Sequence, residues 1–304
     1  MKKILKIVLV CGALLLSSFS FSAQYSQQLV DQAQAGNAKA QYQVGQCVYF
    51  GQGVTKDKYI GFVWMLESAK QGYAPAQLSV GESYYWGIGT EKNKYKAVEW
   101  YKKASYQRNT NAMYQLSMAY LLGEGIQQDI KKGNALKIQA ANMGNIKAQI
   151  DLAQSYRTGD EDEQIPKNLE KVAYWYSKAA ALGDKNALNN LAYMYAMGDG
   201  VTQNHTTALK YYLMAAQKGE DSSQVAICGY YLEGQAPLPQ DFIKARSWCQ
   251  VAADKNNNDA KLLLGRIYAK GLGVKQDKAK ALYWYKQVDY EAEAQRYINV
   301  SDRK

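Results

Sequence analysis

The chain has few of the residues from which catalytic and metal sites are most often built. Its 304 residues include one histidine, four cysteines and four prolines. A single histidine excludes a histidine-rich metal site and makes His205 the one imidazole available for Ser-His-Asp or Cys-His chemistry. His205 directly follows Asn204, and no serine or cysteine stands at a defined spacing from it, so we interpret it as a helix-start residue. The sequence predicts no catalytic residues, no metal site and no cofactor.

Long apolar runs are also scarce, and the one that exists lies near the N-terminus. Lys2, Lys3 and Lys6 precede an apolar run over residues 7–16, and a tail of small residues ends at Ala23. This is the layout of a secretory signal peptide with cleavage near Ala23, because a membrane span needs about 20 apolar residues and this run is much shorter. We therefore expect residues 1–23 to be removed, leaving a periplasmic or secreted protein with no integral membrane segment.

Positive charge is in excess, but it is not concentrated in one segment. The net charge is +10, and removal of the leader, with three lysines and no acids, lowers it to +7. The other lysines are spread along the chain, so we expect no nucleic-acid partner. The acidic run at residues 160–163 lacks the glycine and the distal glutamate of a calcium loop, and we interpret it as a solvated insertion.

Glycine is plentiful, and its spacing divides the chain into repeats of about 36 residues. Seventeen of the 24 glycines fall into two series with this period. Glycines in such positions allow a positive φ or a tight turn. The first series consists of pairs at 51/53, 87/89, 123/125, 198/200 and 271/273, with single members at 159 and 234. The second series is Gly36, Gly72, Gly144, Gly183 and Gly219, with Arg108 and Asn256 in its gaps.

Aspartate or asparagine follows the first glycine of each pair, and each of the two single glycines, usually six residues later. Short polar acceptors at such a point are typical helix N-caps. An aromatic residue stands seven residues further on in six of the seven copies, with Leu136 as the exception. The pattern predicts a second helix in each repeat, capped by Asp57, Asn93, Asp129, Asn168, Asn204, Asp241 and Asp277.

The first helix of each repeat has its own signature, in which alanine is followed by an aliphatic residue, a small residue and tyrosine. Ala187, Leu191, Ala192 and Tyr195 are one example, and the steps of four place them on one helix face. Because one helix pair cannot bury its apolar face alone, successive pairs are expected to stack. The sequence predicts an all-α protein, an α-solenoid coiled as a right-handed superhelix of seven helix-turn-helix repeats.

The spacing also gives the expected domain organisation. A signal peptide covers residues 1–23, a partial repeat or cap helix covers residues 24–36, and a C-terminal capping helix and tail cover residues 290–304. The seven repeats are expected at residues 37–72, 73–108, 109–144, 145–183, 184–219, 220–256 and 257–289.

The repeat resembles the Sel1-like repeat, a relative of the tetratricopeptide repeat. The shared elements are Ala-x-x-x-Leu-Gly-x-x-Tyr, Gly-x-Gly-Val, Asp-x-x-Lys-Ala, Trp-Tyr-x-Lys-Ala-Ala and a final glycine, and the copy at residues 187–219 shows them well. Residue 48 is valine where the repeat has tyrosine, and residues 136–137 lack the aromatic pair. The resemblance implies an adaptor or scaffold that binds another protein in the bacterial envelope, in host interaction or in control of cell-wall enzymes.

Two other functions follow from the same resemblance. Some members act as immunity proteins that neutralise a periplasmic toxin effector such as a lipase. A β-lactamase-like or cell-wall hydrolase activity has been suggested for a cysteine-rich subgroup, but the cysteine pairs that bridge its successive repeats are missing here. We therefore expect a protein that is not an enzyme and whose partner is an envelope enzyme, a host protein or a toxin effector.

Partner contacts are expected on the first helices, which line the concave surface of such solenoids. Residues outside the packing series are free to face that surface, and tyrosine and arginine are common anchors of protein interfaces. The alternative is that these side chains are half-buried packing residues. The candidates are Tyr42, Tyr49, Glu82, Tyr85, Tyr114, Arg157, Tyr193 and Arg266.

Three cysteines remain after removal of the leader. Cys228 occupies the small-residue position of a first helix, and Cys249 stands beside Trp248 on the second helix of the same repeat. In an oxidising compartment these two form either a disulfide or a pair of buried thiols. Cys47 is left over and is expected in the core.

Overall fold

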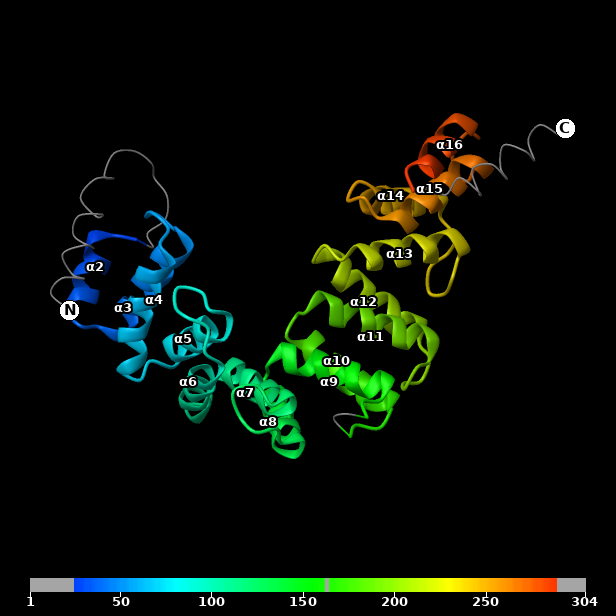
Figure 1. Ribbon diagram of the computed structural model, residues 1–304. Helices are drawn as coiled ribbons and strands as arrows, with labels where there is room; N and C mark the ends of the chain where they lie inside the picture. The colour runs from blue at the N-terminus through cyan, green and yellow to red at the C-terminus, as the bar shows by residue number, and fades with distance from the viewer. Residues whose placement is uncertain (1–24, 162–163, 289–304) are drawn as a thin grey trace. The chain divides into compact units, whose positions relative to one another are not determined.

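A computed structural model describes residues 25–161 and 164–288. The leader, residue 289 and the expected C-terminal cap at residues 290–304 lie outside the described residues. The described part is all-α, with 15 helices arranged in sequential pairs (Figure 1), and this confirms the predicted repeat architecture. The helices are α2 Gln27–Gln34, α3 Ala38–Phe50, α4 Lys58–Lys70, α5 Ala74–Trp86, α6 Lys94–Tyr106, α7 Thr110–Leu122, α8 Ile130–Asn142, α9 Ile146–Thr158, α10 Leu169–Ala181, α11 Lys185–Met197, α12 His205–Gln217, α13 Asp221–Glu233, α14 Phe242–Ala253, α15 Asn258–Lys270 and α16 Lys278–Lys286.

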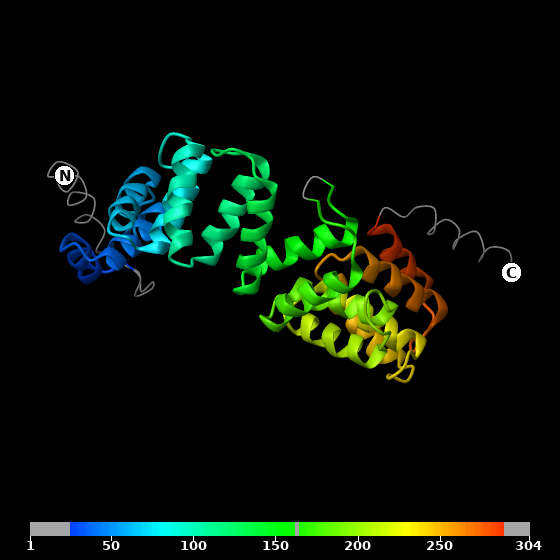
Figure 2. The ribbon, with the colours of Figure 1, turned by 90° about the horizontal axis from the view of Figure 1, so that it is seen from below.

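The helices fall into two compact units. Unit 1 covers the described residues up to Ala148 together with Gln164, and unit 2 covers residues 149–161 and 165–288. In unit 1 the pairs are α3–α4, α5–α6 and α7–α8, with α2 packed on α3. In unit 2 the pairs α11–α12, α13–α14 and α15–α16 follow α10. Figure 2 shows that the two helices of a pair run antiparallel and that consecutive pairs within a unit are neighbours.

The N-caps form where the polar spacing predicted them. In α4 the carboxylate of Asp57 accepts a hydrogen bond from the amide of Ile60 at 2.9 Å, and in α6 Asn93 accepts one from Lys96 at 2.9 Å. Each such cap is worth about 1 kcal/mol. The same bond is present at all seven predicted positions, which are Asp57, Asn93, Asp129, Asn168, Asn204, Asp241 and Asp277.

The two glycine series explain where the helices stop. The first member of a Gly-x-Gly pair ends a first helix in the left-handed conformation, as Gly87 does with φ 70°. The second series adopts the same region just after the second helices. Arg108, with φ 63°, and Asn256, with φ 70°, take the conformation that glycine has in the other copies. An arginine at such a position is under backbone strain, because its Cβ disfavours this region.

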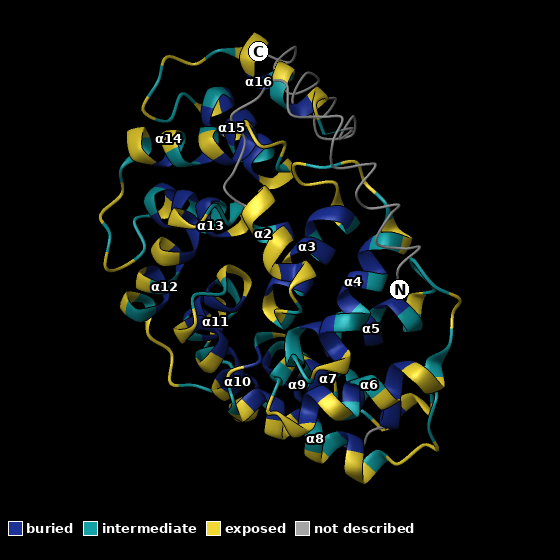
Figure 3. Cartoon of the chain, turned by 90° about the vertical axis from the view of Figure 1, so that its left-hand side faces the viewer, coloured by how far each residue is buried: buried dark blue, intermediate teal, exposed yellow. Residues whose placement is uncertain are grey.

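The core lies between the paired helices and is built from small residues facing large ones. Figure 3 shows buried residues gathered along the helix faces that turn toward one another. Gly45 on α3 faces Met65 on α4, and Gly81 on α5 faces Tyr101 on α6. Lys137 is fully buried at the corresponding position of α8, in the repeat that lacks the aromatic pair. The small residue brings the two backbones close together, and the large one fills the remaining space.

Candidate functional site

Unit 1 carries a continuous set of polar side chains along its first helices, which we call the polar strip: Tyr42, Gln46, Ser79, Glu82 and Gln115. The amide of Gln46 donates to the Tyr42 hydroxyl at 2.7 Å, and that hydroxyl lies 3.5 Å from the Ser79 hydroxyl on the next first helix. The ring of Tyr42 also meets Tyr73 edge-on at 5.4 Å. Burial raises the pKa of Tyr42, so its hydroxyl stays protonated and serves as a hydrogen-bonding group.

Glu82 is the charged member of the polar strip. It is half-buried on α5, and this burial raises the pKa of its carboxyl. The Lys147 ammonium and a hydrogen bond from Gln115 on α7 act in the opposite direction and lower the pKa, but they do not offset the burial. A carboxylate is therefore held in a partly desolvated position, where its charge is more strongly felt than in water.

Three candidate tyrosines of unit 1 are only half exposed. Tyr49 packs against the core and hydrogen-bonds Ser83, and Tyr114 is half-buried on α7. Tyr85 donates its hydroxyl to Glu124 Oε2 at 2.5 Å, which raises the pKa of the tyrosine to about 12. These residues thus combine a packing role with a polar edge at the surface.

Lys94 completes a bridge between two repeats around Tyr85. Its Nζ lies 2.6 Å from Glu124 Oε1 and 5.5 Å from the centre of the Tyr85 ring. These bonds to Lys94 and Tyr85 lower the pKa of the Glu124 carboxyl. The bridge joins α5, the start of α6 and the loop after α7, and it ties these elements of unit 1 together.

The candidates of unit 2 lie on separate helices. Arg157 on α9 donates from Nη2 to the hydroxyl of the buried Tyr176 at 3.0 Å and lies over that ring at 5.2 Å. Tyr193 on α11 and Arg266 on α15 are exposed. Among the contacts of the described residues, no hydrogen bond or ion pair joins these three side chains to one another.

A cavity next to the polar strip was not predicted from the sequence. It measures about 360 Å³ and lies between α2, α3 and the start of the following loop. Gln46 belongs both to this cavity and to the polar strip, so the two are continuous. Burial raises the pKa of the Cys47 thiol, one of the lining residues, and this keeps the sulfur protonated. Its lining is Ser26, Gln28, Leu29, Gln32, Gln43, Gln46, Cys47 and Gln52.

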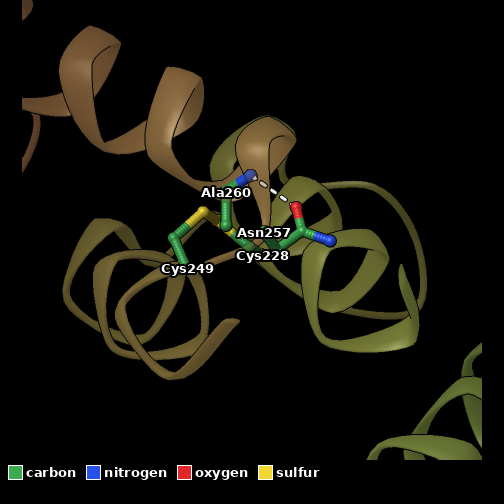
Figure 4. Close-up of a disulfide and its surroundings, with 4 residues drawn as sticks. All are labelled: Cys228, Cys249, Asn257 and Ala260. Carbon is green, nitrogen blue, oxygen red and sulfur yellow. Dashed lines mark hydrogen bonds between the residues drawn. A yellow bond between two sulfur atoms is a disulfide. The ribbon is translucent and has the colours of Figure 1, made fainter. Parts of the chain in front are cut away.

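Cys228 and Cys249 are joined by a disulfide that links α13 to α14, with an S–S distance of 2.05 Å (Figure 4). Both residues are fully buried in a cluster that includes Leu264 and Ile267. They stand at the positions that Gly81 and Tyr101 hold in the second repeat. A covalent link thus replaces a small–large packing pair.

His205 is the first residue of α12, where its Nδ1 lies 3.2 Å from the Tyr230 hydroxyl. Within residues 25–161 and 164–288, no group of three or more histidine, cysteine, aspartate or glutamate side chains is placed to hold a metal ion. No helix in this part of the chain combines the length and the apolar character required to cross a membrane.

Seven segments of the chain match one known repeat family. The sequence profile of the Sel1 repeat matches residues 38–73, 74–109, 110–145, 146–184, 185–220, 222–257 and 258–287. The Sel1-repeat-containing protein YjcO of Escherichia coli K12 is 35% identical over 124 residues, which are 40% of this chain and 53% of YjcO. The chain therefore spans about half the length of this relative.

Two solved structures are similar over most of the chain. One is c5321, described as a protective antigen present in uropathogenic Escherichia coli strains and displaying an SLR fold. It has 31% sequence identity and a TM-score of 0.77, over 89% of this chain and 58% of c5321. The other is a Sel1 repeat protein from Oxalobacter formigenes, with 28% identity and a TM-score of 0.63, over 84% of this chain and 99% of that protein.

Proposed function

The chain belongs to the Sel1 repeat family, and from that premise we propose that it is a non-enzymatic scaffold that binds another protein through the polar strip of unit 1. Family membership alone does not fix function, so the proposal depends on the site. The observation that carries it is Glu82, a carboxylate kept half-buried on a surface made of polar side chains. Burial disfavours its charged form in the isolated protein, and residues that weaken stability in this way are typical of binding surfaces.

The chemistry of the strip defines the kind of segment it would hold. Glu82 would receive a lysine or arginine side chain of the partner, because a partly desolvated carboxylate gains most from a nearby cation. The side-chain amides around the adjacent cavity, such as those of Gln32 and Gln43, would pair with backbone groups of an extended segment. The rings of Tyr42 and Tyr114 would supply apolar contact area. In unit 2, the exposed Arg157 and Arg266 would pair with carboxylates of the partner, and the exposed Tyr193 would supply a further ring.

We propose that the protein acts outside the cytoplasm, in the periplasm or after secretion. Two observations support this location. The leader at residues 1–23 has the layout of a signal peptide, and the Cys228–Cys249 disulfide belongs to an oxidising compartment. The partner would then be an envelope protein or a host protein, which accords with a role in host interaction or in control of cell-wall enzymes.

The immunity function remains the second candidate, because a toxin-blocking protein would use the same kind of surface. An adjacent reading frame for a toxin such as a lipase, and inhibition of that toxin by this chain, would favour it. A hydrolase is the third candidate, and turnover of nitrocefin or digestion of peptidoglycan by the purified protein would favour it. Neither activity is expected under the scaffold proposal.

Capture of partners from a periplasmic extract, with crosslinking, tests the scaffold proposal. The informative variant is Glu82→Lys, and its matched control is Glu99→Lys, which makes the same charge change on the exposed face of α6. The unaltered chain and Glu99→Lys should enrich the same protein, whereas folded Glu82→Lys should lose it. Equal enrichment by both variants would reject the polar strip as the binding surface.

A further inference from the structure

A second surface of unit 1 differs in character from the polar strip. It is the end of the helix pairs at which the first helices stop and the second helices begin, together with loops 51–57, 87–93 and 123–129. We call it the loop edge. Consecutive parts of this edge touch, because the backbone at Gly89 packs against the Lys58 carbonyl, and Gly125 packs against the Lys94 carbonyl. The edge is therefore one continuous surface across three repeats.

Large apolar side chains project from the loop edge. Among the described residues of unit 1, seven large apolar side chains are exposed, and five of these seven lie at this end. Each of the five is between 57% and 75% exposed, so most of each residue is open to solvent. They are Phe50, Tyr59, Trp86, Tyr95 and Leu122.

Their spacing follows the repeat. Phe50, Trp86 and Leu122 are the last residues of α3, α5 and α7, whereas Tyr59 and Tyr95 are the second residues of α4 and α6. A row of exposed apolar side chains of this kind is costly in water, and exposed apolar patches on proteins usually mark an interaction surface.

Lysines are frequent in the same segments of the chain. Residues 50–59, 86–96 and 122–132 contain seven lysines and four carboxylates. Three of the carboxylates are already engaged, since Asp57 and Asp129 cap helices and Glu124 is paired with Lys94. Lys56, Lys58, Lys92, Lys96, Lys131 and Lys132 are exposed. The edge therefore presents positive charge next to Trp, Tyr and Phe side chains.

We propose that the loop edge of unit 1 rests on an anionic phospholipid surface. Tryptophan and tyrosine are the side chains that favour the interface between lipid and water, and lysines near the surface are attracted by anionic headgroups. A row of protruding rings flanked by cations matches such a surface better than it matches a peptide, which would need a groove. Attachment of this kind goes beyond the scaffold function, because it would hold the scaffold at a membrane while the polar strip remains available to a protein.

The same positions in unit 2 provide an internal control. The last residues of α11, α13 and α15 are Met197, Glu233 and Lys270, and the second residues of α12 and α14 are Thr206 and Ile243. Only Met197 and Ile243 are large, apolar and exposed among these described positions. Replacing them removes as many apolar side chains as replacing Trp86 and Tyr95.

Sedimentation with lipid vesicles tests the proposal. The chain is expressed with its own leader, and the protein purified from the cells is mixed with vesicles of phosphatidylcholine. One set of vesicles also contains phosphatidylglycerol, and the other does not. Binding should require phosphatidylglycerol and should weaken at high salt. The double variant Trp86→Ser/Tyr95→Ser should bind about tenfold more weakly or worse, whereas Met197→Ser/Ile243→Ser should bind normally.

Three results would overturn the proposal: no binding to vesicles that contain phosphatidylglycerol, equal binding by both double variants, or capture of an acidic protein by the edge without any vesicle binding. The last result would make the loop edge a protein-docking surface. Glu82→Lys should bind vesicles at least as well as the unaltered chain, so failure of the membrane proposal is distinguishable from failure of the scaffold function.

Discussion

The backbone of α5 passes directly beneath a ring of α6, so that a Cβ added to Gly81 would lie 2.5 Å from Cε1 of Tyr101. The same contact recurs in the last described pair, where Gly265 lies beneath the ring of Tyr285. The close approach of the two helices in these repeats therefore depends on a small residue in the first helix and a large one in the second. A glycine-to-alanine substitution in the first helix, which adds a single methyl group, therefore tests how the helix pair packs.

Gly81→Ala should lower the free energy of unfolding. The added methyl group would force the Tyr101 ring to move within a packed core, at a cost of about 1–3 kcal/mol. Gly229→Ala is the matched control, because nothing lies within 4 Å of a Cβ added at that helical glycine. The control should be neutral or stabilising by about 0.5–1 kcal/mol, since alanine favours helix more than glycine does. Denaturant unfolding would measure both changes, and equal effects would contradict the packing account.

The repeat that contains Cys228 and Cys249 should tolerate the glycine–tyrosine pair that the second repeat has at the same two positions. Cys228→Ala/Cys249→Ala removes the covalent link and should lower the free energy of unfolding by about 2–4 kcal/mol. Cys228→Gly/Cys249→Tyr removes the same link but restores the arrangement of Gly81 and Tyr101. This variant should therefore regain a substantial part of the lost stability. Thermal unfolding under reducing and oxidising conditions would measure the difference. If it is no more stable than the alanine pair, the two arrangements are not equivalent.

Arg108→Gly should stabilise unit 1. Arg108 has φ 63°, in the region that costs an L-residue about 1 kcal/mol and costs glycine little. Part of the gain is offset by the greater freedom of glycine in the unfolded chain, so we expect an increase below about 1 kcal/mol. Arg108→Ala retains the backbone strain and serves as the control for loss of the side chain. A glycine variant no more stable than the alanine variant would argue against strain at this position.

Glu82→Gln should change the pH dependence of stability. Burial raises the pKa of the Glu82 carboxyl above its ordinary value of 4.5. Because the folded state holds this proton more tightly, the contribution to stability is complete below the unfolded pKa and is lost as the pH rises through the folded pKa. At neutral pH the glutamine variant should therefore be more stable, by less than about 1 kcal/mol because the site is half exposed. The difference should shrink in acid, and a difference that grows on acidification would mean that the charge is stabilising.

The helix boundaries could be predicted from the sequence because the residues that set them lie close by in the chain. The cap at Asp57 and the left-handed turn at Gly51 lie within a few residues of the helices they limit, and each copy of the repeat shows the same pattern. The conformation of Arg108 also follows from its place in the glycine series.

The site was less predictable, because it depends on how one repeat stacks on the next. Tyr85 and Glu124 are 39 residues apart and meet only in the stacked helices. The cavity between α2 and α3 was missed because glutamines such as Gln32 and Gln43 look like ordinary solvent-facing residues in the sequence. The sequence signal for it is their density, since five glutamines line that one cavity.

Photo-crosslinking at Gln46 tests the central claim most directly. A benzophenone side chain is placed there, where the polar strip meets the cavity, and in a separate sample at Glu99 on the exposed face of α6. After irradiation of intact cells, an adduct with one defined protein should form at Gln46 and none at Glu99. The same adduct at both positions, or at Glu99 alone, would contradict the claim that the first-helix face of unit 1 binds the partner.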